Sequence, residues 1–112
     1  MTTPDTLPTD REPTRAEVDA LDAPIVLEFG TGWCPHCLGA QPAITAVRAQ
    51  FPAIAHRQVE DGRGRPLGRS FAVKLWPTLV FLHRGRELAR VVRPQGEDEL
   101  RRAWQALADA AA

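Results

Sequence analysis

Two nearly continuous apolar runs stand out in the pattern of hydrophobic and polar positions. Residues 25–29 and 78–83 are almost uninterrupted apolar stretches, which is typical of central strands buried on both faces of a sheet. Residues 54–59 form a weaker run, because polar side chains interrupt it, and predict a half-exposed edge strand. Residues 87–92 follow a tight glycine turn and predict a hairpin partner for the 78–83 strand.

Segments with apolar residues at helical spacing lie between and after these strands. Residues 35–50 carry an inward-facing apolar stripe, and the segment that starts at residue 97 repeats apolar residues at i, i+3, i+4, i+7 and i+8. Shorter helices are predicted at 15–21, behind a capping-box sequence, and at 67–73. This order of elements predicts an α/β layer fold, in which helices cover both faces of a mixed central sheet of about four strands.

Length and composition are those of one small domain. A chain of 112 residues with 44% hydrophobic and 25% charged residues can bury one sizeable core. Residues 1–13 hold prolines among threonine and aspartate, with Leu7 as the side chain to bury, and predict a flexible N-terminal tail. The folded domain is therefore expected over residues 14–112.

Charge and hydropathy argue against several classes of partner. The formal net charge is zero, so we expect neither nucleic acid nor a membrane surface as a partner. No stretch approaches the ~20 apolar residues that span a bilayer, and the first residues lack the basic and apolar regions of a secretory signal. We therefore expect a cytoplasmic monomer, in a reducing compartment where paired cysteines are more often chemically active than structural.

The chemistry of the chain centres on its two cysteines. Cys34 and Cys37 are separated by two residues, at the junction of the 25–29 strand and the 35–50 helix. Such a pair is typical of a dithiol that can close into a disulfide. A structural disulfide and half of a metal site are the alternatives. A closed zinc site needs four ligands, and the histidines lie in different predicted elements.

Several features in this order resemble the thioredoxin family. They are an apolar strand, the sequence Trp-Cys-x-x-Cys, a helix with an internal proline, Pro-Thr at the next strand, a glycine hairpin and a closing amphipathic helix. The resemblance covers residues 23–107, and it implies a thioredoxin-like fold and the activity of a thiol–disulfide oxidoreductase. The first strand of the family has no match within residues 1–13, so we expect it to be missing.

The resemblance implies a role for each residue that matches the family pattern. Cys34 matches the exposed nucleophilic cysteine, and Cys37 matches the buried cysteine that resolves the mixed disulfide. Glu28 matches the buried acid that assists deprotonation of the second cysteine, and Pro42 matches the proline inside the helix. Pro77 matches the cis-proline that lies against the dithiol and binds the backbone of the substrate.

An apolar rim for extended polypeptide is predicted around the dithiol. The candidate substrate-binding residues are Trp33, Pro35, Trp76, Pro77 and Arg93. Arg93 stands where the family has a glycine that faces the dithiol. A cation at that place would favour a thiolate and acidic substrates.

Three further departures from the family pattern bear on the chemistry. Pro35-His36 replaces the usual Gly-Pro and resembles the dipeptide of the bacterial Dsb oxidants. Gly30 stands where a tryptophan usually follows the strand. The lysine that the family places near the buried acid has no clear counterpart, with Arg57 or Gln58 nearest, and the two histidines outside the motif are expected to be solvated.

The place of Cys34 before a helix is expected to lower its pKa. Unpaired N–H groups and the helix dipole stabilise a thiolate there, and His36 adds a donor beside the same sulfur. Because a stabilised thiolate makes the disulfide more oxidising, we expect a reduction potential between about −270 mV, as in thioredoxin, and about −120 mV, as in the Dsb oxidant. Desolvation is expected to raise the pKa of Glu28, which would then accept the Cys37 proton.

These residues predict a protein thiol–disulfide oxidoreductase that acts through Cys34 and Cys37. It needs no cofactor besides this redox-active pair. Its expected partners are proteins that carry disulfides or dithiols, and an external reductase or glutathione that restores the dithiol. The alternatives are a disulfide oxidase or isomerase, a polypeptide-binding module whose dithiol is idle, and a carrier of copper or zinc.

Overall fold

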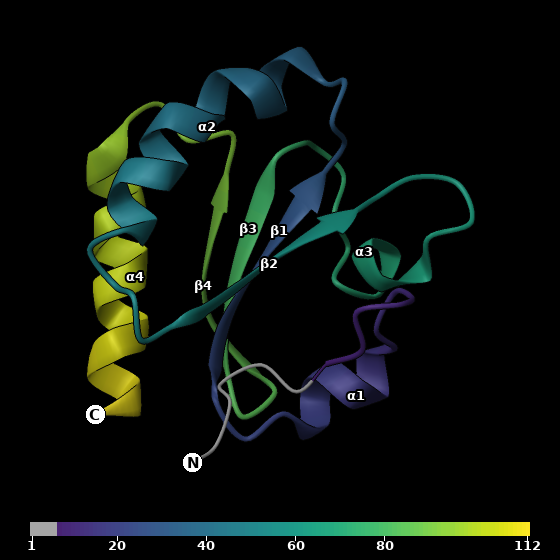
Figure 1. The fold of residues 1–112 in the computed structure, drawn as a ribbon, viewed down its shortest axis with the longest axis horizontal. Coiled ribbons are helices and arrows are strands. Elements are labelled where there is room, and N and C mark those ends of the chain that lie inside the picture. Colours follow the sequence, from purple (N-terminus) through teal and green to yellow (C-terminus); the bar gives the residue numbers. More distant parts are fainter. Residues whose placement is uncertain (1–6) are drawn as a thin grey trace.

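A four-stranded mixed sheet forms the centre of residues 7–112, the part of the chain that the computed structural model describes (Figure 1). The strands are β1 (Pro24–Gly30), β2 (Ala55–Glu60), β3 (Thr78–His83) and β4 (Arg86–Val92). Their order is β2-β1-β3-β4, with β1 parallel to β2 and antiparallel to β3, and β3 antiparallel to β4. The predicted mixed sheet and the predicted edge position of the 54–59 strand are both confirmed.

Helices cover both faces of this sheet, as predicted. They are α1 (Arg15–Ala20), α2 (Pro35–Arg48), α3 (Pro66–Ser70) and α4 (Glu97–Ala111). Figure 1 shows α2 and α4 on one face and α1 and α3 on the other. The largest difference from the predicted bounds is at α3, which ends at Ser70. Two residues later Ala72 has a φ of 56°, a left-handed conformation that an α-helix cannot contain.

Successive residues of β1 contribute to two separate cores, because side chains alternate between the faces of a strand. Ile25, Leu27 and Phe29 belong to the core under α1 and α3, whereas Val26 belongs to the core under α2 and α4. The α2–α4 core is completed mainly by Ala40, Ile44, Val47, Leu79, Phe81, Leu100, Trp104 and Leu107. Glu28 follows Val26 on this second face, so its carboxylate is carried into an apolar layer.

Residues 7–13 pack against the domain although they were predicted as part of a flexible tail. Leu7 is buried in the α1–α3 core, and the Arg57 guanidinium donates a hydrogen bond to the Pro8 carbonyl. Glu12 Oε1 accepts a hydrogen bond from the Leu67 backbone N–H at 3.0 Å. Residues 7–13 contain no strand, and the rest of the predicted tail, residues 1–6, lies outside the described residues.

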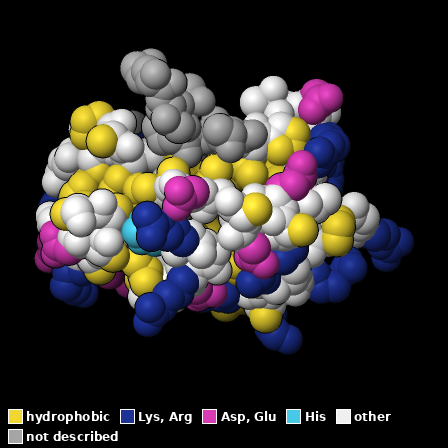
Figure 2. All heavy atoms as spheres, turned by 90° about the horizontal axis from the view of Figure 1, so that it is seen from below, with side chains coloured by type: hydrophobic (Ala, Val, Ile, Leu, Met, Phe, Trp, Pro, Cys, Tyr) yellow, Lys and Arg dark blue, Asp and Glu magenta, His cyan; other side chains and the backbone are white. Residues whose placement is uncertain are grey.

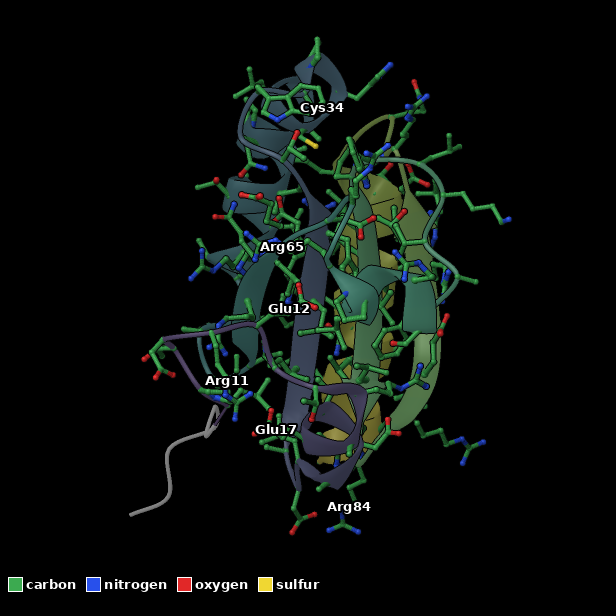
Figure 3. The ribbon with its side chains drawn as sticks, turned by 90° about the vertical axis from the view of Figure 1, so that its right-hand side faces the viewer. Arg11, Glu12, Glu17, Cys34, Arg65 and Arg84 are labelled. Atoms are coloured by element: carbon green, nitrogen blue, oxygen red, sulfur yellow. The ribbon has the colours of Figure 1, made fainter. Side chains whose placement is uncertain are left out.

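The predicted capping box at the start of α1 is present. Thr14 Oγ1 accepts the Glu17 backbone N–H at 3.1 Å, and Glu17 Oε1 accepts the Thr14 backbone N–H at 2.8 Å. Both terminal nitrogens of Arg11 also donate to the Glu17 carboxylate at 2.7 Å (Figure 3). Together the Arg11 guanidinium and the Thr14 backbone lower the pKa of Glu17 to about 2, which keeps this cap ionised.

Charged side chains of both signs are spread over the surface. Figure 2 shows the face seen from below in Figure 1, where basic and acidic groups are interspersed with apolar ones. This mixture agrees with the formal net charge of zero. Among the helices of residues 7–112, none combines the length and the apolar character that a membrane crossing requires.

Candidate functional site

The two cysteines lie at the N-terminus of α2. Cys34 is the N-cap residue, Pro35 follows in the first turn, and Cys37 lies one turn further along. The Cys34 carbonyl accepts the Leu38 backbone N–H at 3.0 Å, and both thiols are free. Figure 3 shows Cys34 at one end of the molecule and Arg84, in the β3–β4 turn, at the opposite end. The dithiol therefore lies at the connection between β1 and the long helix α2.

Little of either sulfur-bearing residue is open to solvent. Cys34 and Cys37 are each 5% exposed, so the predicted exposure of Cys34 is wrong. Trp33, by contrast, is 72% exposed, and its ring makes an edge-to-face contact with Trp76 at a centroid distance of 5.9 Å and an interplanar angle of 84°. An exposed indole therefore lies next to Cys34 in the chain, in contact with the ring of Trp76.

The surroundings of Cys34 favour its thiolate. The backbone N–H of Cys37 is the main cause of a lowered pKa of Cys34, and burial of the sulfur opposes it. The Cys37 thiol, the backbone N–H of His36 and the positive charge of Arg93 lower this pKa further. The direction is the predicted one, but His36 acts through its backbone N–H, whereas its ring was expected to act.

The surroundings of Cys37 favour its protonated form. Burial is the main cause of a raised pKa of Cys37, and the negative charges of Cys34 and Glu28 add to it. A hydrogen bond from the Thr31 backbone N–H acts in the opposite sense and does not cancel the rise. The pKa values of the two thiols are thus shifted in opposite directions, and Cys34 is the first to ionise as the pH rises.

The loop before β3 lies beside the dithiol. The Trp76–Pro77 peptide bond is cis, as the resemblance implies. A Cβ built on Gly30 would lie 2.5 Å from Cys37 Sγ and 3.9 Å from Trp76 Cβ. Trp76, which precedes Pro77 in this loop, therefore lies close to the Cys37 sulfur. Trp76 Nε1 donates to Asp61 Oδ2 at 2.8 Å, so the indole is anchored from the end of β2.

Arg93 also holds the loop before β3 in place, through two hydrogen bonds. Its Nε donates to the Trp76 carbonyl at 2.9 Å, and its backbone N–H donates to the Pro77 carbonyl at 2.9 Å. The φ of Arg93 is 48°, in the left-handed region that favours glycine. The guanidinium is thereby held near Cys34, where its charge contributes to the lowered pKa of that thiol.

A buried acid lies behind the dithiol. Glu28 is 5% exposed, and Gln41 Nε2 donates to its Oε2 at 2.7 Å and to the Cys37 carbonyl at 3.3 Å. The other oxygen, Oε1, is 2.7 Å from His56 Nε2. Burial acts to raise the pKa of Glu28, but the hydrogen bonds from His56 and Gln41 outweigh it and the pKa is lowered. The predicted rise is therefore wrong.

His56 is the residue that sequence reasoning missed. It was expected to be solvated, yet its side chain is 3% exposed and pairs with the buried acid. Arg57, one of the two residues expected nearest to the acid, reaches the opposite face of the sheet and bonds Pro8. Gln58 lies opposite Glu28 in the parallel register. Strand alternation puts positions 56 and 58 on one face, and this was the signal that could have found His56.

A pocket of about 260 Å³ opens beside the buried cysteine. Its lining includes Glu28, Gly30, Cys37, Gln41 and Gln58. Because Gly30 has no side chain, Cys37 Sγ packs directly against its backbone, at a place where a Cβ would lie only 2.5 Å from the sulfur. The pocket thus joins Cys37 to the buried Glu28 carboxylate.

The sequence profile of thioredoxin matches residues 6–106. The chain belongs to the thioredoxin family. Reduced thioredoxin 2 from Pseudomonas aeruginosa PAO1 is similar in structure, with a TM-score of 0.82 and 50% sequence identity over 94% of this chain and 97% of that one. The predicted thioredoxin-like fold is confirmed.

Plant thioredoxins are more distant relatives. Thioredoxin H2-2 from Oryza sativa subsp. japonica is 30% identical over 70% of this chain and 58% of its own length. Thioredoxin H2 from Arabidopsis thaliana is 29% identical over 68% of this chain and 56% of its own length. The chain thus matches less than two thirds of the length of these curated thioredoxins. Among residues 7–112 of this chain, no three His, Cys, Asp or Glu side chains gather as ligands of a metal ion would.

We expect two well-separated thiol ionisations when the absorbance of thiolate is followed against pH. The Cys34 step should fall below the ordinary thiol value of about 8.5 and the Cys37 step above it. Arg93→Gln removes a positive charge near Cys34 and should move the first step upward, while Arg84→Gln, at the opposite end of the molecule, should leave both steps in place. A first step at or above that of free cysteine would contradict this assignment.

Proposed function

We propose that this member of the thioredoxin family is a protein thiol–disulfide oxidoreductase that exchanges disulfides through Cys34 and Cys37. The observation that carries the proposal is a free dithiol at the N-terminus of α2 in which the pKa of Cys34 is lowered and that of Cys37 is raised. A thiolate attacks a disulfide, whereas a thiol does not. The difference between the two sulfurs therefore decides which of them begins the reaction.

The exchange has two balanced steps. The Cys34 thiolate attacks one sulfur of the substrate disulfide, forms a mixed disulfide and releases the other sulfur as a thiolate. Cys37 then loses its proton and attacks Cys34 Sγ, which forms the Cys34–Cys37 disulfide and releases the second substrate sulfur. Two electrons pass to the substrate, and the protein is left oxidised. Glu28 lines the same pocket as Cys37 and is the proposed acceptor of the Cys37 proton.

The surface around the dithiol suits an extended polypeptide. The large apolar side chains left exposed among the described residues are Trp33, Leu38, Leu75 and Val92. We assign substrate binding to Trp33, Pro35, Trp76, Pro77 and Arg93. The charge of Arg93 at this place favours substrates with acidic groups beside the disulfide.

Reduction of protein disulfides is the proposed direction, with an external reductase or glutathione as the source of electrons. A disulfide oxidase or isomerase is the second candidate, and the stabilised Cys34 thiolate is the observation that favours it, because it makes the disulfide more oxidising. The redox-active cysteine pair serves in place of a cofactor in either case. The cytoplasmic location and the monomeric state stay predictions.

Equilibration with glutathione redox buffers, followed by thiol alkylation and mass measurement, tests this proposal. We expect a reduction potential between about −270 and −120 mV, and reduction of insulin in the presence of dithiothreitol. A potential near the upper limit with poor insulin reduction would favour the oxidase. If Cys34 and Cys37 do not equilibrate with glutathione at all, the proposal is refuted. The chain would then be a polypeptide-binding module whose dithiol is idle.

A further inference from the structure

We propose that Asp61 is a positioning residue for substrate recognition. Its carboxylate holds the indole of Trp76 against that of Trp33, and the two rings together select disulfides that are flanked by an aromatic residue. The inference rests on the proposed disulfide exchange and deepens it, because it names a class of substrate. The observation that carries it is the hydrogen bond of 2.8 Å from Trp76 Nε1 to Asp61 Oδ2, which joins the loop after β2 to the loop before β3.

Asp61 is itself held on two sides. Its backbone N–H donates to the Gly30 carbonyl at 2.9 Å, one residue beyond the end of β2. On the other side its carboxylate lies against Gly68 of α3, where an added Cβ would collide with Asp61 Oδ1. The acceptor for the indole N–H is therefore placed by the sheet and by α3.

Trp76 is held through both its backbone and its side chain. Arg93 Nε donates to the Trp76 carbonyl at 2.9 Å, and Asp61 accepts the indole N–H. A Cβ built on Gly30 would lie 3.9 Å from Trp76 Cβ and 2.5 Å from Cys37 Sγ, so this side chain starts close to the dithiol. Because two side-chain torsions set the place of an indole, a hydrogen bond at its Nε1 selects one orientation of the ring.

The ring of Trp76 supports that of Trp33. Trp33 directly precedes Cys34 and is 72% exposed, and its ring meets Trp76 edge to face at a centroid distance of 5.9 Å. An exposed indole next to the attacking sulfur is open to contact with a substrate. An aromatic side chain beside the substrate disulfide would gain ring contacts there that are worth up to about tenfold in affinity.

The bond between Asp61 and Trp76 lies outside both cores of the domain. Both residues are half-buried, and Trp76 belongs to neither of the two clusters of buried apolar side chains. The charge of Asp61 is also not among the main causes that shift the pKa of Cys34 or of Cys37. Loss of this carboxylate should therefore affect recognition more than it affects the fold or the chemistry of the sulfurs.

Two disulfide-linked peptides that differ only in the residue beside the cysteine, Phe or Ser, test the inference. Their reduction is measured with dithiothreitol as the source of electrons. We expect the parent to prefer the Phe peptide by about fivefold to tenfold in kcat/KM, mainly through a lower KM. In Asp61→Ala the preference should fall below about twofold, because KM for the Phe peptide rises while kcat stays within about twofold.

Three variants separate the hydrogen bond from other effects. Asp61→Asn keeps an acceptor for the indole N–H without the charge and should restore most of the preference. Trp76→Phe keeps a ring without the N–H and should lose it, and Asp61→Ala added to that variant should lower it no further. Asp109→Ala removes an exposed carboxylate near the end of α4 and should behave as the parent does.

A small disulfide without a ring isolates the chemistry of the dithiol. The parent and all four variants should reduce 2-hydroxyethyl disulfide at rates within about twofold of one another, since none of them removes a main cause of the Cys34 pKa shift. A parent that does not reduce this compound would refute the proposed function itself. A parent that reduces it but shows no preference for the Phe peptide would overturn only the inference.

Circular dichroism reports the contact between the two rings directly. Two indoles in contact give an exciton couplet, and Trp33→Phe identifies it by its loss. We expect the couplet to be weakened in Asp61→Ala and kept in Asp61→Asn. An Asp61→Ala protein that keeps both the couplet and the preference for the Phe peptide would overturn the inference, as would a loss of preference in Asp61→Asn equal to that in Asp61→Ala.

Discussion

Cys34→Ser is expected to abolish disulfide exchange, and Cys37→Ser is expected to trap the substrate on the protein. Cys34 supplies the attacking thiolate, so its loss should reduce insulin reduction by at least about 10³-fold. Cys37→Ser should retain the first attack within a few-fold, because Cys34 still lies at the N-terminus of α2. Without a resolving sulfur the mixed disulfide should persist, and intact-mass spectrometry should show one covalently bound substrate per chain.

The control for both variants is Thr45→Ser, an exposed change on the same helix, which should leave exchange and stability as in the parent. Adducts on Cys37 in the Cys34→Ser variant, at the rate of the parent, would show that the roles of the two cysteines are reversed. Full activity in Cys34→Ser would show that the dithiol is idle and that the chain only binds polypeptide.

Trp104→Ala is expected to cost about 3–5 kcal/mol of the free energy of unfolding. Trp104 is fully buried in the α2–α4 core, where its ring makes an edge-to-face contact with Phe81 at 5.1 Å and stacks on His56. Truncation would leave a cavity among rigid strands and would release the imidazole that Trp104 positions. Urea denaturation should show the loss as a lower midpoint.

Two other tryptophan variants calibrate this result. Trp33→Ala, at a largely exposed ring, should change the free energy of unfolding by less than about 1 kcal/mol. Trp104→Phe keeps an aromatic ring against Phe81 and removes a buried indole N–H that has no partner among the described residues, so it should cost less than the alanine change. An equal loss of the free energy of unfolding in Trp33→Ala and Trp104→Ala would contradict the conclusion that Trp104 stabilises the α2–α4 core.

Short-range patterns in the chain predicted most of the fold. The apolar runs at β1 and β3, and the polar interruption of β2, follow directly from how many faces of each strand are covered. The pair Cys34 and Cys37 marked the dithiol, because two sulfurs one helical turn apart have few other uses in one small chain. Local spacing was sufficient for each of these elements.

Contacts between distant segments were less predictable. The pairing of Glu28 with His56 joins two strands through a register that no short window contains. The same pairing reversed the direction of the Glu28 pKa, since desolvation could be anticipated but the donors that outweigh it could not. Burial of Leu7 was missed for a similar reason, because its core neighbours come from residues much later in the chain.

The dithiol and the α1 region lie in different parts of the molecule. Glu28, His56 and the helix that carries the dithiol lie on the α2–α4 side, whereas α1 and the β3–β4 turn meet at the far end, where a Cβ on Gly85 would collide with the Asp19 backbone. A tether or a fluorescent label attached near α1 should therefore leave electron exchange intact. This makes the far end a practical handle for immobilising the protein on an electrode with its sulfurs facing the solution.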